Sequence, residues 1–92
     1  MKVMRLILFT ANVCPNCPAA KRVVEEVGSR YPELEVRVLN IEESGNMQLA
    51  LSYHVFSTPA IAIDEETVFV GEAPTREQLS REIEKRKNSR TR

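Results

Sequence analysis

Two cysteines stand at positions 14 and 17, between a strand pattern and a helix pattern. Residues 3–10 are almost continuously apolar, which is typical of a central strand buried on both faces. From Cys17 onward, apolar residues recur at helical spacing, and charged residues occupy the opposite face. A C-x-x-C pair between a strand and a helix predicts a strand–turn–helix unit and is typical of a dithiol redox site.

The helix pattern makes the two thiols inequivalent. Cys17 shares an apolar stripe with Ala20 and Val24, whereas Cys14 precedes the first turn, so we expect Cys17 to be buried and Cys14 exposed. The backbone N–H groups and the dipole at a helix start favour the thiolate of a nearby cysteine. Because residues 1–24 contain no acid, we expect the pKa of Cys14 to lie below the free value of about 8.5.

Two prolines bear on where this helix begins. Pro15 fits the first helical position, where a backbone N–H has no partner in any case. Pro18 fits less well, because its missing N–H would have bonded to the Cys14 carbonyl. We therefore expect a loosened or kinked first turn.

A second strand and a second helix follow. Residues 34–38 alternate apolar and charged side chains, which predicts a strand. Ser44 is a candidate N-cap for the next helix. The predicted apolar positions of that helix are Met47, Ala50, Leu51 and His54.

The last third of the chain predicts a hairpin and a helix. Residues 60–63 and 67–70 form two short apolar runs with a connection tight enough for an antiparallel hairpin. A capping box from Thr75 to Gln78 opens the last helix, whose thin apolar face is Leu79 and Ile83.

Length and composition indicate one small globular domain. The 92 residues suffice for one hydrophobic core, and a net charge of zero gives no reason to expect nucleic acid or a membrane surface. No apolar run approaches the roughly 20 residues of a membrane span. The run at residues 6–9 is too short for the core of a signal peptide, so we expect a cytoplasmic protein.

The cysteine pair has a metal alternative. In the cytoplasm a lone pair is more often catalytic or metal-binding than a structural disulfide. Structural zinc normally takes four ligands, and the one histidine, His54, lies far away in sequence. Only a dimer that shares ligands would complete such a site, so we predict no metal and no cofactor in a monomer.

The C-terminus is basic, with five lysines and arginines among the last eight residues. We interpret residues 1–84 as the domain and residues 85–92 as a basic tail that is either a helix end or disordered. Docking to an acidic partner is the alternative role of this tail.

The chain resembles the thioredoxin/glutaredoxin superfamily over essentially its whole length. Three features match in order: the C-x-x-C motif after the first strand, the pair Thr58-Pro59 before a later strand, and Gly71 after the strand that follows. Residues 9–18 are especially similar to the small, glutaredoxin-sized thioredoxins of archaea and anaerobic bacteria.

The resemblance implies an α/β fold and a reaction. The expected fold is the thioredoxin fold, βαβ-α-ββα, with a central four-stranded mixed sheet flanked by three helices. Cys14 would attack the disulfide of a protein substrate, and Cys17 would resolve the mixed disulfide. Pro59 would be cis. The substrate-binding residues implied are Val13, Pro15, Asn16, Thr58 and Pro59, and the implied partners are disulfide-containing proteins and a reductase that supplies electrons.

Three departures from the family affect the expected chemistry. Tryptophan usually precedes the first cysteine, where this chain has Val13, and the strand before the motif lacks the usual buried aspartate. Residues 71–74 hold one glycine where glutaredoxins have a Gly-Gly-acid turn that binds glutathione. We therefore rank a protein disulfide reductase first. A glutathione-dependent reductase is the alternative, as is a dimeric module that binds a metal or an iron–sulfur cluster.

Three residues near the Thr58-Pro59 pair have structural interpretations. We expect Tyr53 and Phe56 to belong to the core rather than to contact substrate. His54 stands where family members often have a glycine in the left-handed region, so we expect it to end a helix. We expect apolar substrate contacts from Val13 and Ala60.

Overall fold

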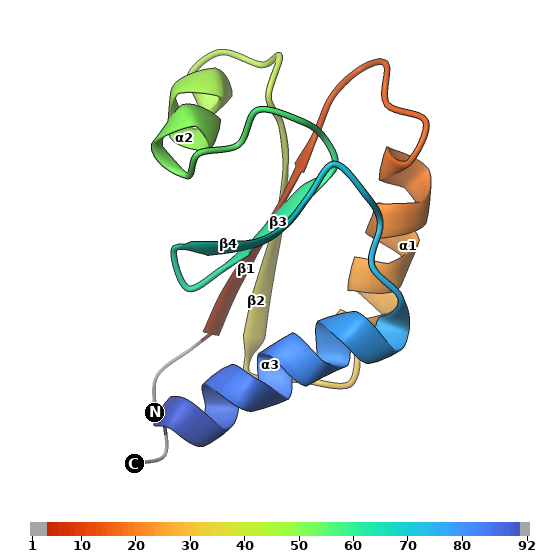
Figure 1. Cartoon of the computed structure of the whole chain (residues 1–92), viewed down its shortest axis with the longest axis vertical. Coiled ribbons are helices and arrows are strands. Elements are labelled where there is room, and N and C mark those ends of the chain that lie inside the picture. The colour runs from red at the N-terminus through yellow and green to blue at the C-terminus, as the bar shows by residue number, and fades with distance from the viewer. Residues whose placement is uncertain (1–3, 91–92) are drawn as a thin grey trace.

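The computed structural model describes the backbone of residues 4–90 and the side chains of residues 4–87. The sheet order is β2-β1-β3-β4, with β1 parallel to β2 and antiparallel to β3, and β3 antiparallel to β4 (Figure 1). This arrangement confirms the predicted mixed sheet with three helices. The elements are β1 (Met4–Thr10), α1 (Cys17–Gly28), β2 (Leu34–Asn40), α2 (Asn46–Ser52), β3 (Ala60–Ile63), β4 (Glu66–Val70) and α3 (Arg76–Arg90).

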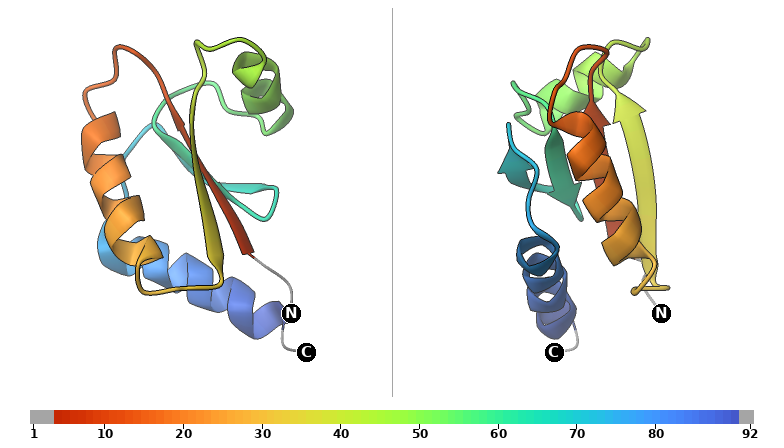
Figure 2. Two further views of the ribbon diagram at one scale, coloured as in Figure 1. Left: turned by 180° about the vertical axis from the view of Figure 1, so that it is seen from behind. Right: turned by 90° about the vertical axis from the view of Figure 1, so that its right-hand side faces the viewer.

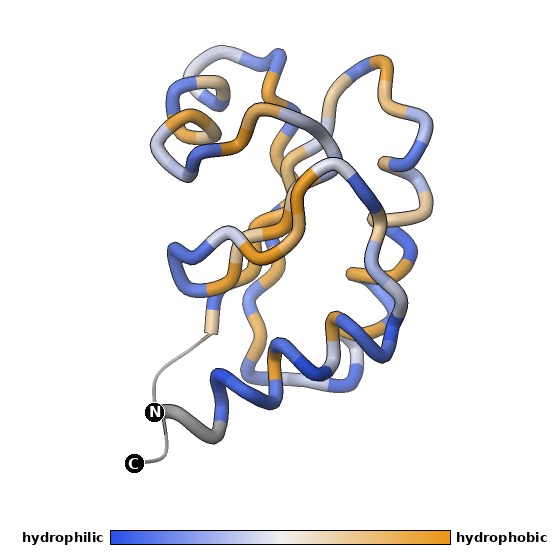
Figure 3. Tube along the Cα trace, viewed as in Figure 1, coloured by the Kyte–Doolittle hydropathy of each residue, from blue (hydrophilic) through white to orange (hydrophobic). Residues whose placement is uncertain are grey.

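The two central strands of the sheet, β1 and β3, are largely buried on both faces, as the continuous apolar pattern of the first strand predicts. Helices α1 and α3 cover one face and α2 covers part of the other (Figures 1 and 2). Alternate residues of β1 point into separate cores: Leu6 and Leu8 pack under α1 and α3, whereas Ile7 and Phe9 pack under α2. Apolar residues accordingly concentrate on the strands, and α3 is mostly hydrophilic (Figure 3).

Helix α2 differs from its prediction. It is capped by Gly45, in the left-handed region with φ of 85°, and not by Ser44. Met47 and Leu51 are 44% and 47% exposed, so the predicted apolar face is wrong except for Ala50. The helix has only seven residues and meets the core through its C-terminal half, where Leu49 and Tyr53 pack beside Ala50.

His54 directly follows the C-cap of α2 and has a φ of 59°. The position therefore takes the left-handed conformation that we expected from its usual glycine.

The hairpin and α3 follow the predictions closely. Asp64 and Glu65 turn the chain with φ of 49° and 71°, so β4 starts at Glu66, one residue early. The capping box forms: the Gln78 N–H donates to Thr75 Oγ1 (3.0 Å), and the Thr75 N–H donates to Gln78 Oε1 (2.9 Å). Leu79 and Ile83 have no exposed surface, which confirms them as the buried face of α3.

Helix α3 continues through residues 85–90. Arg86 pairs with Glu82 and Glu66, and the Lys87 ammonium lies 2.9 Å from the Glu33 carboxylate. This part of the basic segment is therefore a helix end, while residues 91–92 lie outside the described residues. The division of the chain into a domain that ends at residue 84 and a tail that follows it stays a prediction.

Candidate redox site

Cys14 and Cys17 are joined in a disulfide, with their Cα atoms 5.3 Å apart. The chain between them is a turn, in which the Cys17 N–H donates to the Cys14 carbonyl over 3.2 Å. Helix α1 begins only at Cys17, with Asn16 as its N-cap. The structure is therefore in the oxidised state of the predicted dithiol.

The prolines take different positions from those predicted. Pro15 lies in the turn and not at the first helical position, which belongs to Cys17. Pro18 is the second helical residue, so its missing N–H would have had no α-helical partner. The first α-helical bond of α1 runs from the Ala20 N–H to the Asn16 carbonyl. Residues 14–16, where we expected a loosened first turn, therefore form a hydrogen-bonded turn before the helix.

The two sulfur-bearing residues differ in burial, as the helix pattern predicts. Cys17 is 6% exposed and begins the buried stripe of α1, which continues with Ala20, Val24 and Val27. Cys14 is only partly buried. Reagents in solution therefore have better access to Cys14 than to Cys17.

The Thr58-Pro59 segment lies at the same end of the sheet as the cysteine loop. Phe9 pairs with Ala60 in antiparallel register, so the chain leaving β1 and the chain entering β3 meet there (Figure 1). The Thr58–Pro59 peptide bond is cis, as the resemblance implied. Pro59 is buried, and its carbonyl accepts a 2.7 Å hydrogen bond from the Gly71 N–H.

The backbone groups of Thr58 differ from the Pro59 carbonyl in their hydrogen bonding. It lies between α2 and β3 and is partly exposed. Within residues 4–90 its N–H and C=O make no hydrogen bond to the rest of the backbone. Both groups therefore lack a backbone partner among the described residues.

Large apolar side chains are exposed on the segments at this end of the sheet. Val13 is 90% exposed and Phe56 is 77% exposed. Phe56 is therefore not a core residue, and its prediction is wrong, whereas Tyr53 packs on Phe9 with ring centroids 5.7 Å apart. Ala60 has no exposed surface, which removes it as a substrate contact.

A polar network that sequence reasoning missed holds the loop before Cys14. The Glu42 carboxylate accepts the Asn12 backbone N–H over 2.6 Å and its side-chain amide over 3.1 Å. The Asn40 amide in turn donates to Asn12 Oδ1 over 2.7 Å. Polar residues after the carboxyl ends of two adjacent parallel strands are the signal that would have indicated these contacts.

Glu42 also changes the local charge. The sequence around Cys14 is free of acids, but folding brings this carboxylate to Asn12, two residues before Cys14. The acid-free surroundings that the first 24 residues predict for the thiol thus gain an acid from another segment.

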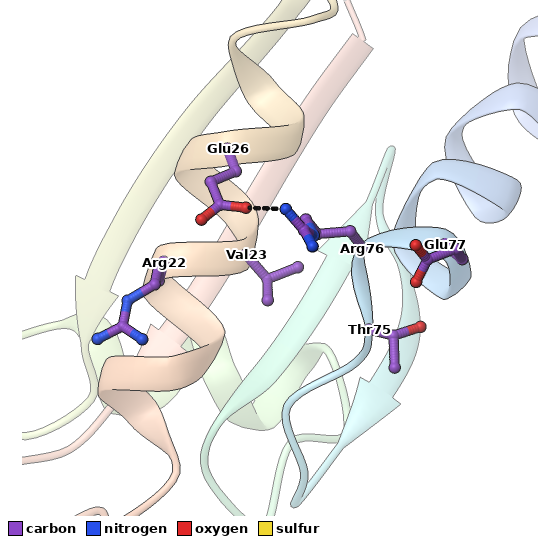
Figure 4. Close-up of a pocket in the computed structure, with 6 residues that line it drawn as sticks. All are labelled: Arg22, Val23, Glu26, Thr75, Arg76 and Glu77. Carbon is purple, nitrogen blue, oxygen red and sulfur yellow. Dashed lines mark hydrogen bonds and ion pairs between the residues drawn. The ribbon is translucent and has the colours of Figure 1, made fainter.

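Two surface hollows lie away from the cysteines. One, of about 420 Å³, lies between α1 and the start of α3, where Arg76 reaches Glu26 over 3.1 Å (Figure 4). Another, of about 500 Å³, is bounded by residues 52–54 and 65–67 together with Val70. Neither of these two hollows is lined by a cysteine.

Two kinds of feature, a metal-binding cluster and a membrane-spanning helix, are absent from the part of the chain that the structure describes. No cluster of three or more histidine, cysteine, aspartate or glutamate side chains is arranged to hold a metal ion. Among residues 4–90 no helix has both the length and the apolar character needed to cross a membrane.

A C-x-x-C disulfide at the start of a helix, beside a cis-proline at the end of a mixed sheet, defines the site of a thiol–disulfide oxidoreductase. The protein family described as "Thioredoxin domain" matches residues 4–84 of this chain. A thioredoxin of Methanocaldococcus jannaschii is 45% identical over 87 residues, 94% of this chain and 99% of the relative. A probable thioredoxin of Archaeoglobus fulgidus is 30% identical over 80 residues, 87% of this chain and 86% of the relative.

Solved structures agree on the fold. A thioredoxin variant from Halobacterium salinarum superposes with a TM-score of 0.76 at 26% identity, covering 91% of this chain and 74% of the other. Oxidised thioredoxin O2 from Arabidopsis thaliana gives a TM-score of 0.75 at 20% identity, covering 91% and 75%. The chain belongs to the thioredoxin family, and it is a disulfide oxidoreductase whose redox-active pair is Cys14 and Cys17.

Proposed function

We propose that this protein reduces protein disulfides through nucleophilic attack by Cys14. The observation that supports this assignment is the contrast between the partly exposed Cys14 and the buried Cys17. The thiolate is the attacking species, and an attacking sulfur must reach the substrate sulfur in line. Cys14 meets both requirements better than Cys17.

The proposed reaction has two exchanges. The Cys14 thiolate attacks one substrate sulfur, a Cys14–substrate disulfide forms, and the other substrate sulfur leaves as a thiolate that takes up a proton. Cys17 then loses its proton and attacks Cys14, releasing the second substrate thiol. The product is the Cys14–Cys17 disulfide, the state present in the structure. A reductase restores the dithiol with two electrons and two protons.

The proposed substrate surface combines backbone and apolar groups. The free N–H and C=O of Thr58 suit an extended substrate strand, beside the buried Pro59. Val13 offers apolar surface and Phe56 adds to it, while Pro15 and Asn16 are exposed between the cysteines. All these residues come from one chain, so we propose a monomer as the catalytic unit.

A trapping experiment tests the assignment. Cys17→Ser should accumulate a mixed disulfide with an oxidised substrate protein, because nothing resolves the adduct. Cys14→Ser should form no stable adduct and should lose turnover by at least ~1,000-fold, since both exchanges pass through Cys14. Mass spectrometry of the non-reduced adducts identifies the linked cysteine. A stable adduct on Cys17 of the Cys14→Ser variant would reverse the roles.

The electron donor is the second point to test. The single glycine at residues 71–74 favours a protein reductase over glutathione, because glutathione needs partners for two carboxylates and an amine. Insulin reduction with dithiothreitol should be efficient, and reduction of a glutathione mixed disulfide by glutathione should be slow. Efficient turnover in the glutathione assay alone would favour a glutaredoxin.

We propose the cytoplasm as the compartment, because the dithiol must be kept reducible.

A further inference from the structure

The sheet has two edges, and only one of them carries a protective irregularity. At the β4 edge, the pairing with β3 shifts register between Ile61 and Ala62, and β4 has five residues. At the other edge, β2 pairs with β1 in unbroken register over seven residues. Edge strands are normally protected by bulges, prolines or charged side chains, especially lysines. β2 has no bulge, proline or lysine, and its two charged residues, Glu35 and Arg37, are of opposite sign.

The backbone of β2 has free hydrogen-bonding groups along this edge. At the ends of the ladder the Ile41 N–H donates to Thr10 and the Glu33 carbonyl accepts from Met4, so the odd-numbered residues of this segment face β1. The N–H and C=O groups of Val36 and Val38 therefore point away from the sheet. No described element lies beyond β2 on this side (Figure 2).

The middle of β2, residues 35–38, is exposed on both faces, whereas Leu34 at its start is buried. Val36 and Val38 are 36% and 41% exposed on the α1 side, where Val36 lies beside Gly28. Glu35 and Arg37 are exposed on the opposite face. Within the described residues neither of these two charges has an ion-pair partner.

The sequence of this edge is complementary to itself. An antiparallel pairing of two β2 edges centred on Val36 places the two Val36 residues opposite each other and Leu34 opposite Val38. The same register places Glu35 of each copy opposite Arg37 of the other. Each of these charges therefore gains a partner of opposite sign, and the dimer contains two such pairs. A register centred on Arg37 would set the two arginines against each other.

We propose that the β2 edge is a self-association surface, on which a second copy of this chain adds its own β2 in antiparallel register centred on Val36. The interface is isologous, which closes the assembly at a dimer. Its free backbone groups supply four hydrogen bonds: Val36 N–H to the Val36 carbonyl and Val38 N–H to the Leu34 carbonyl, each in both directions. The two sheets become one continuous sheet.

The dimer should be weak and salt-sensitive. One strand edge buries less than the roughly 1,600 Å² of a standard interface, so we expect a dissociation constant on the order of 100 µM. The two Glu35–Arg37 pairs are exposed and therefore screened by added salt. Dimerisation leaves the proposed catalytic unit unchanged, because the cysteines are not on this edge.

Charge-swap variants test the register. Arg37→Glu and Glu35→Arg should each weaken dimerisation at least tenfold in sedimentation equilibrium, because each places like charges opposite one another. An equimolar mixture of the two single variants should form heterodimers, since every pair then has opposite charges. Arg81→Glu, the same change on the exposed face of α3, should leave the dimer unaffected.

Amide exchange gives a second measurement that does not rely on variants. The Val36 and Val38 amides should exchange more slowly as the concentration of the wild-type protein rises past the dissociation constant. A monomer up to about 1 mM would overturn the proposal, as would a dimer that Arg37→Glu leaves intact. Single variants that associate no better when mixed would also overturn it.

Discussion

Cys14 and Cys17 are three positions apart, yet they lie in regions that are held together differently. Around Cys17, α1 packs on the sheet through fully buried aliphatic side chains, beside the equally buried face of α3. Around Cys14, the chain is exposed and its loop is fixed mainly by the hydrogen bonds among Asn12, Asn40 and Glu42. One cysteine belongs to the core and the other to the surface.

This difference shows how the fold separates stability from reactivity. Apolar burial contributes roughly 25 cal/mol per Å², so the core around Cys17 carries much of the folding free energy. A hydrogen bond between exposed groups contributes only about 1 kcal/mol net. The reactive sulfur therefore lies in the region where a substitution costs the least free energy of unfolding. Substitutions in the core around Cys17 should destabilise the protein more than substitutions in the loop around Cys14.

The largest effect is expected in the core. Leu79→Ala removes a fully buried side chain from the core that α1 and α3 share and should lower the free energy of unfolding by about 2–5 kcal/mol. Urea denaturation of the oxidised protein measures the change. Met47→Ala, on the exposed side of α2, is the matched control and should cost less than about 0.5 kcal/mol. Equal losses of unfolding free energy in the two variants would mean that burial in this core does not set the cost of a truncation.

A smaller loss is expected in the polar network. Asn12→Ala removes the side-chain bonds to Glu42 and Asn40 and should lower the free energy of unfolding by about 1 kcal/mol. Amide exchange in residues 11–13 should accelerate at the same time. Ser44→Ala, an exposed residue with no side-chain hydrogen bond in the described structure, is the control. A loss above about 2 kcal/mol would mean that the loop contributes to stability as a core does.

Phe56→Ala should separate function from stability. Because Phe56 is 77% exposed, its truncation should change the free energy of unfolding by less than about 0.5 kcal/mol. The KM for a protein disulfide should rise about fivefold, which corresponds to about 1 kcal/mol of lost apolar contact. Leu51→Ala, at 47% exposure on α2, is the control. An unchanged KM would exclude Phe56 from the substrate surface.

The smallest effect is expected in the pH dependence of stability, through the ion pair between Lys87 and Glu33. The Lys87 ammonium donates to the Glu33 carboxylate and holds the pKa of Glu33 below its ordinary value, which also raises the pKa of Lys87. A depressed carboxyl pKa contributes stability above its unfolded value, and this is lost as the pH falls through the folded value. NMR titration should show the pKa of Glu33 rising towards normal in Lys87→Gln. An unchanged titration would mean that this pair is absent in solution.

The order of elements could be predicted from the sequence because each strand and helix carries its own periodicity. The buried stripe of α1, the capping box at Thr75 and the hairpin after β3 all depend on residues near one another in the chain. The phase of α2 could not be predicted, because a seven-residue helix has too few positions to distinguish one apolar face from another. The start of α1 was also misplaced, because Pro15 suits a first helical position, whereas the helix begins two residues later and places Pro18 in its first turn.

The site could be predicted only in part. The positions of Cys14, Thr58 and Pro59 follow from the motifs and the resemblance. Phe56 was assigned to the core because its residue type is usually buried, and nothing local indicates its exposure. The contact between Glu42 and Asn12 joins residues 30 positions apart, so it depends on the parallel register of β1 and β2.

The central claim is that Cys14 is the reactive sulfur and Cys17 the protected one. Alkylation of the reduced protein with limiting iodoacetamide, followed by peptide mass spectrometry, compares the two thiols in one sample. The account predicts that Cys14 is alkylated at least tenfold faster than Cys17 at pH 7, with a rate that titrates below the free cysteine pKa of about 8.5. Equal rates, or faster alkylation of Cys17, would contradict it.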